Sequence, residues 1–186
     1  MYYKVKVTDH VRLPPTEYST STEEAIVGVI KKDYSGLISK DFGLVIDVAG
    51  VDSIQDGIII PEDGATYYET NFTLLTFQPE LQEIILGKIK DITDFGAFLS
   101  MGPIEGMIHI SQAINDFVSF SKEKQLQGKE TKRSLKVGDD CLGKVIAVSY
   151  KDINNPKIGL TMRQEGLGKK EWIIDDLTNA KKTKKK

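Results

Sequence analysis

The sequence has a single cysteine, Cys141, and only two histidines, which removes the usual ligands and nucleophiles of several kinds of site. One cysteine cannot form an intramolecular disulfide, and the two histidines lack zinc-ligand spacing. Cys141 is interpreted as a small core residue. The chain also has no Gly-rich phosphate loop before Lys-Ser or Lys-Thr, no nucleophile elbow and no paired carboxylates joined to a base. We therefore expect no metal, no cofactor and no catalytic residues.

Long hydrophobic runs are absent as well. No apolar segment approaches the ~20 residues that cross a bilayer, and the first seven residues lack the apolar region of a secretory signal. The sequence therefore predicts a cytoplasmic protein without membrane contact. With 186 residues, 40% of them hydrophobic and 28% charged, it has the profile of a globular protein of one large or two small domains.

Charge is distributed unevenly along the chain. Residues 1–80 carry 6 basic and 13 acidic side chains, whereas residues 81–180 carry 14 of each and residues 181–186 add five lysines. An acidic first half is a poor partner for phosphate, so nucleic-acid contacts are expected in the second half or in the tail. The Lys-rich tail is interpreted as a solvated end of the chain.

Residues 1–80 have the pattern of a small α+β domain. Residues 2–8 alternate apolar and polar side chains as in a half-buried strand, which we expect to end at Pro14-Pro15. A helix capped by Ser21 or Thr20 should follow, because apolar residues then recur every four positions along one face. Further strands are expected at 42–51 and 71–77, with Asp-Gly turns at 56–57 and 63–64. This predicts one helix packed on a small antiparallel sheet, a truncated RNP-like domain.

From residue 81 the pattern changes, because strand-like segments follow one another without an amphipathic helix between them. Five strands are expected, which is the number in an OB-fold barrel, at 81–92, 97–101, 106–110, 140–150 and 157–162. Residues 111–136 are rich in serine and charged residues and are interpreted as an insertion with room for a short helix. Residues 165–177 predict a terminal amphipathic helix anchored by Trp172. The expected domains are thus 1–80 and 81–180, followed by the tail at 181–186.

Two blocks in the second half carry glycines, aromatic residues and apolar alternation in a fixed order. They are Gly-Lys-Ile-Lys-Asp-Ile-Thr-Asp-Phe-Gly-Ala-Phe-Leu at 87–99 and Glu-Gly-Met-Ile-His-Ile-Ser at 105–111, and segments 135–139 and 144–148 continue the pattern. This order resembles the RNA-binding OB-fold repeat first named in the largest protein of the small ribosomal subunit. The resemblance implies an all-β barrel that binds single-stranded RNA.

Further segments, at 11–15, 63–67, 128–131, 160–164 and 167–173, extend the resemblance to nearly the whole chain. With them the chain is similar to the family of the E-prime stalk protein of archaeal RNA polymerase, whose eukaryotic equivalent is the seventh polymerase subunit. The resemblance implies a stalk subunit of a DNA-directed RNA polymerase. In that family the N-terminal tip domain docks on the polymerase core near the clamp, and the barrel binds emerging transcript. A helical partner, the F subunit of RNA polymerase, packs along both domains to form a heterodimer.

Single-stranded RNA is held by aromatic rings that stack on bases and by cations that neutralise phosphates. The RNA-binding candidates are the positions that match the repeat and nearby basic residues: Phe95, Phe98, His109, Lys144, Lys157 and Arg163. Either lysine or the arginine could equally be a solvated charge. Likewise, His109 could be an ordinary surface histidine.

Phe95 and Phe98 are three residues apart, so strict strand alternation would put their rings on opposite faces. A bulge at Gly96, or a place for Phe95 just before the strand, would bring both rings to one surface. The alternative is that Phe98 belongs to the core and only Phe95 is exposed.

Two positions depart from the repeat. Ser149 stands where the repeat usually has aspartate, and Lys157 stands where it usually has arginine. A lysine keeps the positive charge but lacks the planar fork that binds phosphate through two hydrogen bonds. We therefore expect RNA binding to be modest and not sequence-specific.

The first domain is expected to act by docking. Ile58, Ile59, Ile60 and Pro61 lie between the two predicted turns, where they would form an exposed apolar tip, and such patches usually mark a partner site. The alternative is a plain strand in the sheet. Asp56 and Asp63 precede glycines, where turns favour aspartate, so neither is interpreted as a metal or acid-base group.

These patterns predict a non-catalytic polymerase subunit that binds emerging RNA and supports transcription initiation and elongation. The alternative is a free RNA-binding factor of translation or RNA decay that uses the same barrel repeat. A metabolic enzyme is disfavoured, because the sequence lacks a catalytic constellation.

Overall fold

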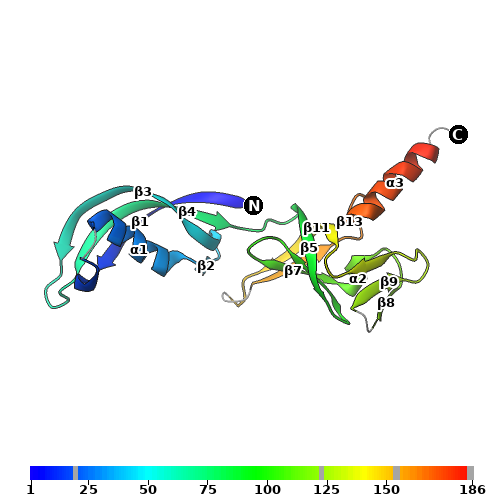
Figure 1. The fold of residues 1–186 in the computed structure, drawn as a ribbon, viewed down its shortest axis with the longest axis horizontal. Coiled ribbons are helices and arrows are strands. Elements are labelled where there is room, and N and C mark those ends of the chain that lie inside the picture. The colour runs from blue at the N-terminus through cyan, green and yellow to red at the C-terminus, as the bar shows by residue number, and fades with distance from the viewer. Residues whose placement is uncertain (19–20, 122–123, 153–155, 184–186) are drawn as a thin grey trace. The chain divides into compact units, whose positions relative to one another are not determined.

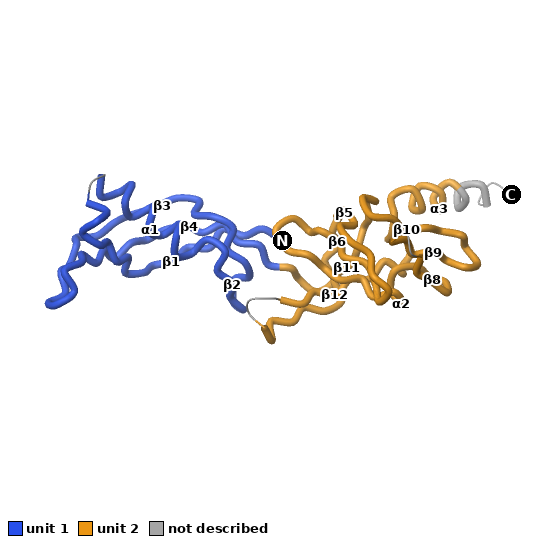
Figure 2. Tube along the Cα trace, turned by 60° about the horizontal axis from the view of Figure 1, so that its bottom comes forward, with its two compact units in different colours: residues 1–78 blue, residues 79–186 orange. Residues whose placement is uncertain are grey.

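The chain folds as two compact units, Met1–Gln78 and Pro79–Lys186 (Figures 1 and 2). The structure is a computed structural model that describes residues 1–18, 21–121, 124–152 and 156–183. The division falls two residues before the boundary expected from the sequence. Residues 184–186 of the expected Lys-rich tail lie outside the described residues.

Unit 1 is one helix packed on a four-stranded antiparallel sheet of order β1-β4-β3-β2 (Figure 1). Its elements are β1 (Tyr2–Leu13), the 3-10 helix η1 (Pro15–Glu17), α1 (Thr22–Tyr34), β2 (Ile38–Ser39), β3 (Gly43–Ile59) and β4 (Thr66–Phe77). This confirms the α+β fold that the sequence predicted. β1 and β4 are longer than expected, because the β1–β4 ladder runs without interruption from Tyr2 opposite Phe77 to Leu13 opposite Thr66.

Helix α1 begins and packs as its sequence predicts. Ser21 is the N-cap residue, and its Oγ accepts a hydrogen bond from the backbone N–H of Glu24 at 3.4 Å. Ile26 and Ile30 are fully buried against the sheet, in the same core cluster as Phe72. The apolar face with four-residue spacing therefore closes the core of unit 1.

One predicted turn is wrong. Asp56-Gly57 lies inside β3, which continues to Ile59 and keeps pairing with β4. A register shift between Ile54 and Gly57 marks a bulge, and a Cβ on Gly57 would overlap the ring of Tyr68. The second Asp-Gly pair does lie in the turn that joins β3 to β4, where Glu62 and Gly64 have φ angles of 78° and 56°.

Unit 2 contains a closed five-stranded barrel, as predicted. Its elements are β5 (Ile84–Ile92), β6 (Gly96–Ser100), β7 (Glu105–His109), α2 (Ile110–Ala113), β8 (Val118–Ser121), β9 (Gln125–Gly128), β10 (Ser134–Lys136), β11 (Asp140–Ser149), β12 (Lys157–Thr161), β13 (Gly168–Lys169) and α3 (Lys170–Thr183). The strand order is β12-β7-β6-β5-β11, and the pairing of β11 with β12 closes the barrel. Alternate residues fill the interior, among them Ile89, Leu99, Ile108, Val145 and Leu160, which are at most 1% exposed.

The barrel also buries Cys141, in agreement with its interpretation as a core residue. Removal from water raises the pKa of its thiol to about 12, so the thiolate is disfavoured.

The insertion has more regular structure than its composition indicated. Besides the short helix α2 it forms a three-stranded antiparallel sheet of order β10-β9-β8, with Leu126 and Leu135 fully buried. Asp116 fastens the base of this sheet, because its Oδ2 accepts hydrogen bonds from the backbone N–H groups of Glu130 at 2.9 Å and Thr131 at 2.8 Å. These bonds, the one from the Thr131 N–H foremost, lower the pKa of the Asp116 carboxyl.

The terminal helix starts five residues later than predicted. Gly166 and Gly168 have φ angles of 78° and 109°, a left-handed conformation that interrupts helical backbone, so α3 begins only at Lys170. Trp172 is buried as expected, and the guanidinium of Arg133 lies 5.6 Å from the centre of its ring. None of the helices in the described residues combines the length and apolar character needed to span a bilayer.

We expect Gly96→Ala to destabilise unit 2 by about 1–3 kcal/mol, the range for overpacked sites. A Cβ on Gly96 would overlap the backbone carbonyl oxygen of Ile108 on the paired strand, which cannot retreat without losing the β6–β7 ladder. The only tryptophan lies in unit 2, so its fluorescence in urea follows this unit. Gly159→Ala in the same barrel is the control, because the nearest atom to an added Cβ there, the Cβ of Ala147, is 3.3 Å away, against 2.2 Å at Gly96. Equal midpoints for the two variants would contradict the close approach.

Candidate functional site

Two of the predicted aromatic residues meet on the outer surface of the barrel. Phe95 lies in the turn just before β6 and Phe98 within β6, and their rings pack edge to face with centroids 6.0 Å apart. Phe95 is 47% exposed, and Phe98 is half-buried rather than part of the buried core. The position of Phe95 ahead of the strand explains how residues three apart share one surface.

His109 ends β7 beside these rings, opposite Gly96 in the β6–β7 ladder. Its exposed side chain is the N-cap of α2, and Nδ1 accepts a hydrogen bond from the backbone N–H of Ser111 at 3.3 Å. An accepting Nδ1 means that the neutral ring carries its proton on Nε2. His109 therefore combines a capping role with a donor that can face a ligand.

The strand register arranges the barrel surface in rows. Phe98 pairs with Met107, which pairs in turn with Gly159 of β12, so these three residues form the row next to His109. Lys157 precedes Gly159 by two residues and lies one row further on. Successive rows are roughly 7 Å apart, so Lys157 belongs to the same exposed surface as the aromatic rings without touching them. It forms no ion pair with a described residue.

Two other basic candidates lie elsewhere. Lys144 is on β11, paired with Thr161, and its Nζ donates to Gln164 Oε1 at 3.3 Å. Lys144 also pairs with Ile84 at the start of β5, whereas Phe98 pairs with Asp91 near its end, so the structure does not bring Lys144 to the aromatic rings. Arg163 follows β12, and its Nε donates to Asn115 Oδ1 at 2.8 Å, which places it at the insertion.

Several surface residues near the rings were not predicted. Met107 is 36% exposed in the row of Phe98, and Lys124 of the insertion forms an ion pair of 2.8 Å with Asp91, which lies opposite Phe98 in the β5–β6 ladder. The hydrogen bond from Lys124 lowers the pKa of the Asp91 carboxyl. The insertion also exposes Phe117 and Phe120. The sequence feature that could have indicated these exposed rings is the pair of phenylalanines within a polar segment.

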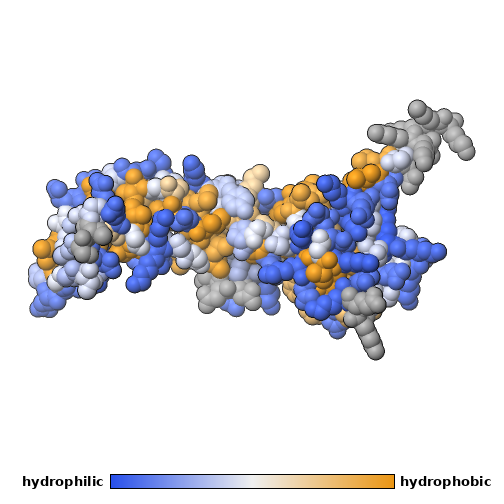
Figure 3. All heavy atoms as spheres, viewed as in Figure 1, coloured by the Kyte–Doolittle hydropathy of each residue, from blue (hydrophilic) through white to orange (hydrophobic). Residues whose placement is uncertain are grey.

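The predicted docking tip is at the turn end of the β3–β4 hairpin in unit 1. Ile58, Ile59 and Ile60 are 62%, 68% and 46% exposed, and Pro61 is exposed as well. Ile58 and Ile59 are the last residues of β3, so the segment is both a strand end and a surface patch. Figure 3 shows apolar residues reaching the surface of unit 1 among polar ones.

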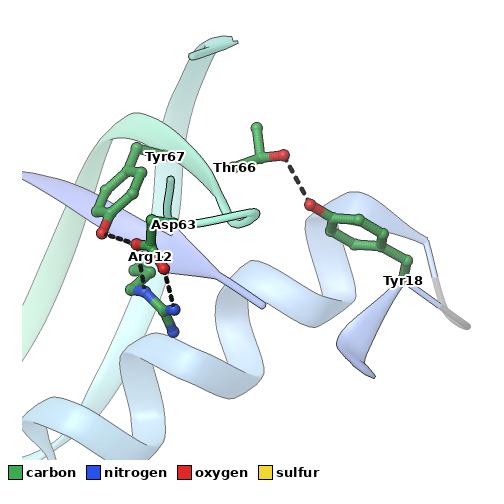
Figure 4. Close-up of polar contacts among 5 residues, drawn as sticks. All are labelled: Arg12, Tyr18, Asp63, Thr66 and Tyr67. Carbon is green, nitrogen blue, oxygen red and sulfur yellow. Dashed lines mark hydrogen bonds and ion pairs between the residues drawn. The ribbon is translucent and has the colours of Figure 1, made fainter. Parts of the chain in front are cut away.

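A polar clamp holds the turn behind the tip (Figure 4). Arg12 of β1 donates from Nε to Asp63 Oδ2 at 2.9 Å and from Nη2 to Oδ1 at 2.5 Å, and the Tyr67 hydroxyl also donates to Oδ2. These contacts, the one from Arg12 foremost, lower the pKa of the Asp63 carboxyl to about 2. A second link joins Tyr18 to Thr66, with the two hydroxyl oxygens 2.7 Å apart. The sequence had assigned Asp63 only to a turn.

Within the described residues, no three histidine, cysteine, aspartate or glutamate side chains come together as a metal site. The arrangement instead offers two surfaces: exposed rings with a nearby lysine on unit 2, and an apolar tip braced by a salt bridge on unit 1.

Comparison with known families assigns a model to each unit. Residues 78–154 match the S1 RNA binding domain, and residues 8–64 match the SHS2 domain found in N terminus of Rpb7p/Rpc25p/MJ0397. The first match contains Phe95, Phe98 and His109, and the second contains the tip and both ends of the Arg12–Asp63 clamp.

Curated relatives match the chain over nearly its whole length. DNA-directed RNA polymerase subunit Rpo7 of Sulfolobus acidocaldarius is 33% identical over 98% of this chain and 100% of the relative, and that of Saccharolobus shibatae is 35% identical over the same shares. DNA-directed RNA polymerase III subunit RPC8 of Bos taurus is 25% identical over 68% of this chain and 62% of its own.

We expect the Asp63 carboxyl to titrate near pH 2 and, in Arg12→Ala, closer to its ordinary value of about 3.9. Because its pKa is lowered on folding, the clamp supports the turn fully above about pH 4 and loses that support as the pH falls through 2. Carboxyl carbon shifts measured by NMR give the titration, and faster amide exchange at residues 62–66 in Arg12→Ala reports the loosened turn. Lys6→Ala, which removes the exposed Lys6–Asp52 pair, is the control. An unchanged Asp63 titration in Arg12→Ala would refute the clamp.

Proposed function

Since the chain belongs to the Rpo7 family of DNA-directed RNA polymerase subunits, it is a stalk subunit, and we propose that it is non-catalytic and guides emerging RNA across its barrel. In this proposal unit 1 docks on the polymerase core near the clamp, and unit 2 holds single-stranded transcript during initiation and elongation. The observation that carries it is the exposed cluster of Phe95, Phe98 and His109 on an S1-type barrel.

The barrel surface has the chemistry for unpaired RNA. The exposed ring of Phe95 offers a face on which any base can stack, and His109 Nε2 offers a hydrogen-bond donor. Lys157, two rows from His109, would neutralise the phosphate of a neighbouring nucleotide. Neither stacking nor a lone lysine discriminates between bases, which supports binding without sequence preference.

The tip supports docking on a protein surface. Three consecutive isoleucines are exposed, and because neighbouring strand residues point to opposite faces they place apolar side chains on both faces of the hairpin end. An apolar centre with a polar rim is the usual composition of a protein interface. Unit 1 is also acidic, which makes it a poor partner for RNA. Asp63 and Arg12 keep the turn in one conformation, which lowers the entropy cost of docking.

We further propose a heterodimer with a helical partner, the F subunit of RNA polymerase. Unit 2 exposes Leu81, Ile84 and Leu86 at and just before the start of β5, where apolar side chains suit a partner helix. The cytoplasmic location expected from the sequence stays a prediction.

Full-length similarity to Rpo7 disfavours the alternative of a free RNA-binding factor, because such a factor would share only the barrel. If the proposal is right, the chain recovers the F subunit and the polymerase core from cell extract. Recovery of ribosomes or an RNA-decay complex instead would overturn it.

The double variant Phe95→Ala with Lys157→Ala should bind single-stranded RNA roughly five- to hundredfold more weakly, the loss of one stacked base. Its thermal stability should hardly change, because both side chains are exposed. Fluorescence anisotropy of a labelled oligouridylate measures the affinity, and loss of one phosphate contact should also flatten its salt dependence. Ile174→Ala with Lys170→Ala on α3 is the matched control, because it removes one exposed apolar side chain and one exposed lysine away from the rings. Equal affinity of the two double variants would show that the RNA-binding surface lies elsewhere.

Ile59→Asp should reduce association with the polymerase core by about tenfold or more, because a charge would be buried at the centre of the docking patch. Binding to the F subunit and to RNA should stay at the wild-type level. Leu37→Asp, which places the same charge on another exposed apolar residue of unit 1, should leave core association intact. Loss of all three interactions in Ile59→Asp would indicate misfolding, and unimpaired core association would exclude the tip.

A further inference from the structure

The inserted β8–β9 hairpin borders the barrel surface that carries Phe95, Phe98 and His109. At its turn, Lys124 forms the 2.8 Å ion pair with Asp91, the residue opposite Phe98. At its base, Phe117 lies next to α2, the helix that His109 caps. The hairpin is therefore attached to the barrel near both ends of the aromatic cluster. Figure 1 shows β8 and β9 beside α2.

A hollow of about 450 Å³ opens where the base of the hairpin meets α2. Its lining includes Ser111, Phe117, Val118 and Arg163. Ser111 connects it to the aromatic cluster, because Ser111 Oγ lies 2.8 Å from His109 Nδ1. The preceding residue, Ile110, is also in the lining and donates its backbone N–H to the carbonyl oxygen of Phe95 at 2.9 Å. The hollow is thus lined by residues that hydrogen-bond to Phe95 and His109 of the proposed RNA-binding surface.

The side chains around the hollow suit a flat aromatic ligand. Phe117 is 76% exposed, which leaves its ring face open, and Phe120 on the same hairpin is 40% exposed. Arg163 donates from Nε to Asn115 Oδ1 and forms no ion pair with a described residue, so its Nη groups are left for a base edge or a phosphate. Asp116 and Glu130, also in the lining, oppose phosphate binding. Stacking rather than charge must therefore supply most of the affinity there.

We propose that the β8–β9 hairpin is a second wall of the RNA-binding surface, and that the hollow holds one nucleobase of single-stranded RNA stacked on Phe117. Arg163, also in the lining, orients that nucleotide. The proposal rests on the RNA-binding function proposed above and adds a subsite outside the barrel strands. A strand that runs over Phe95 and His109 passes Ser111 before it reaches Phe117, so the subsite should be filled only by RNA long enough to extend beyond the barrel.

Oligomer length separates the two sites. We expect the affinity of the full chain for labelled oligouridylate to rise between four and about ten nucleotides, within the ~4–16 nucleotides that OB-folds cover. In Phe117→Ala the affinity for the tetramer should equal wild type, whereas the longer RNA should bind roughly five- to hundredfold more weakly. Phe117→Trp should restore the longer-RNA affinity, because it keeps an aromatic face. Ile174→Ala on α3 is the control for loss of an exposed apolar side chain.

The outcomes distinguish this proposal from the one it rests on. Equal binding of the longer RNA by wild type and Phe117→Ala, with weaker binding by Phe95→Ala, would overturn the subsite alone. No RNA binding by the wild-type chain would overturn both. Should Phe117→Ala impair association with the polymerase but not with RNA, the hollow is a protein-docking site and the proposal fails. The urea midpoint of Phe117→Ala, followed by Trp172 fluorescence, is compared with that of wild type. Equal midpoints exclude a folding defect as the cause of weaker binding.

Discussion

Each strand of a closed five-stranded barrel gives alternate side chains to the interior, and this constraint decides which rings can face solvent in unit 2. Ile108 and Leu99 point inward, so the residues beside them, Met107 and Phe98, must point outward. Phe95 can lie on the same surface as Phe98 only because it precedes the strand, where side chains need not alternate. The tight pairing of Gly96 with β7 then holds both rings on one surface. A core requirement, rather than a dedicated pocket, therefore creates the surface that is proposed to bind RNA.

Unit 1 has a different constraint, because its docking tip must keep apolar side chains at the surface. Isoleucines at the end of a hairpin would normally be free to collapse onto the sheet. The bidentate contact between Arg12 and Asp63 ties the turn to β1 and so fixes the direction in which the hairpin end points. The contact matters for the orientation of the turn rather than for the free energy of unfolding, because an exposed ion pair contributes little stability.

Periodicity and capping predicted most of the fold, because the residues that determine it are local. Ser21 caps α1 and the five strands appear in the expected order. The prediction of a turn at Asp56-Gly57 was wrong because a bulge uses the same residue types as a turn, and only pairing with the partner strand distinguishes the two. The aromatic site followed from family resemblance, whereas the Arg12–Asp63 contact joins residues 51 apart and had no local signal. Phe117 was visible only as an aromatic residue in a polar segment, and its place depends on how the insertion folds back.

Charge pairing on the barrel surface explains why aromatic contacts should dominate RNA binding. Lys90 is paired with Glu105 and Lys124 with Asp91, so two of the cations nearest the rings are already neutralised. Lys157 and Arg163 keep their charge, but they lie at different ends of the surface. Few phosphates can then be neutralised at once, and the salt dependence of binding should be shallow. A surface of this kind holds a strand by its bases and lets its sequence vary, which suits the proposed contact with emerging transcript.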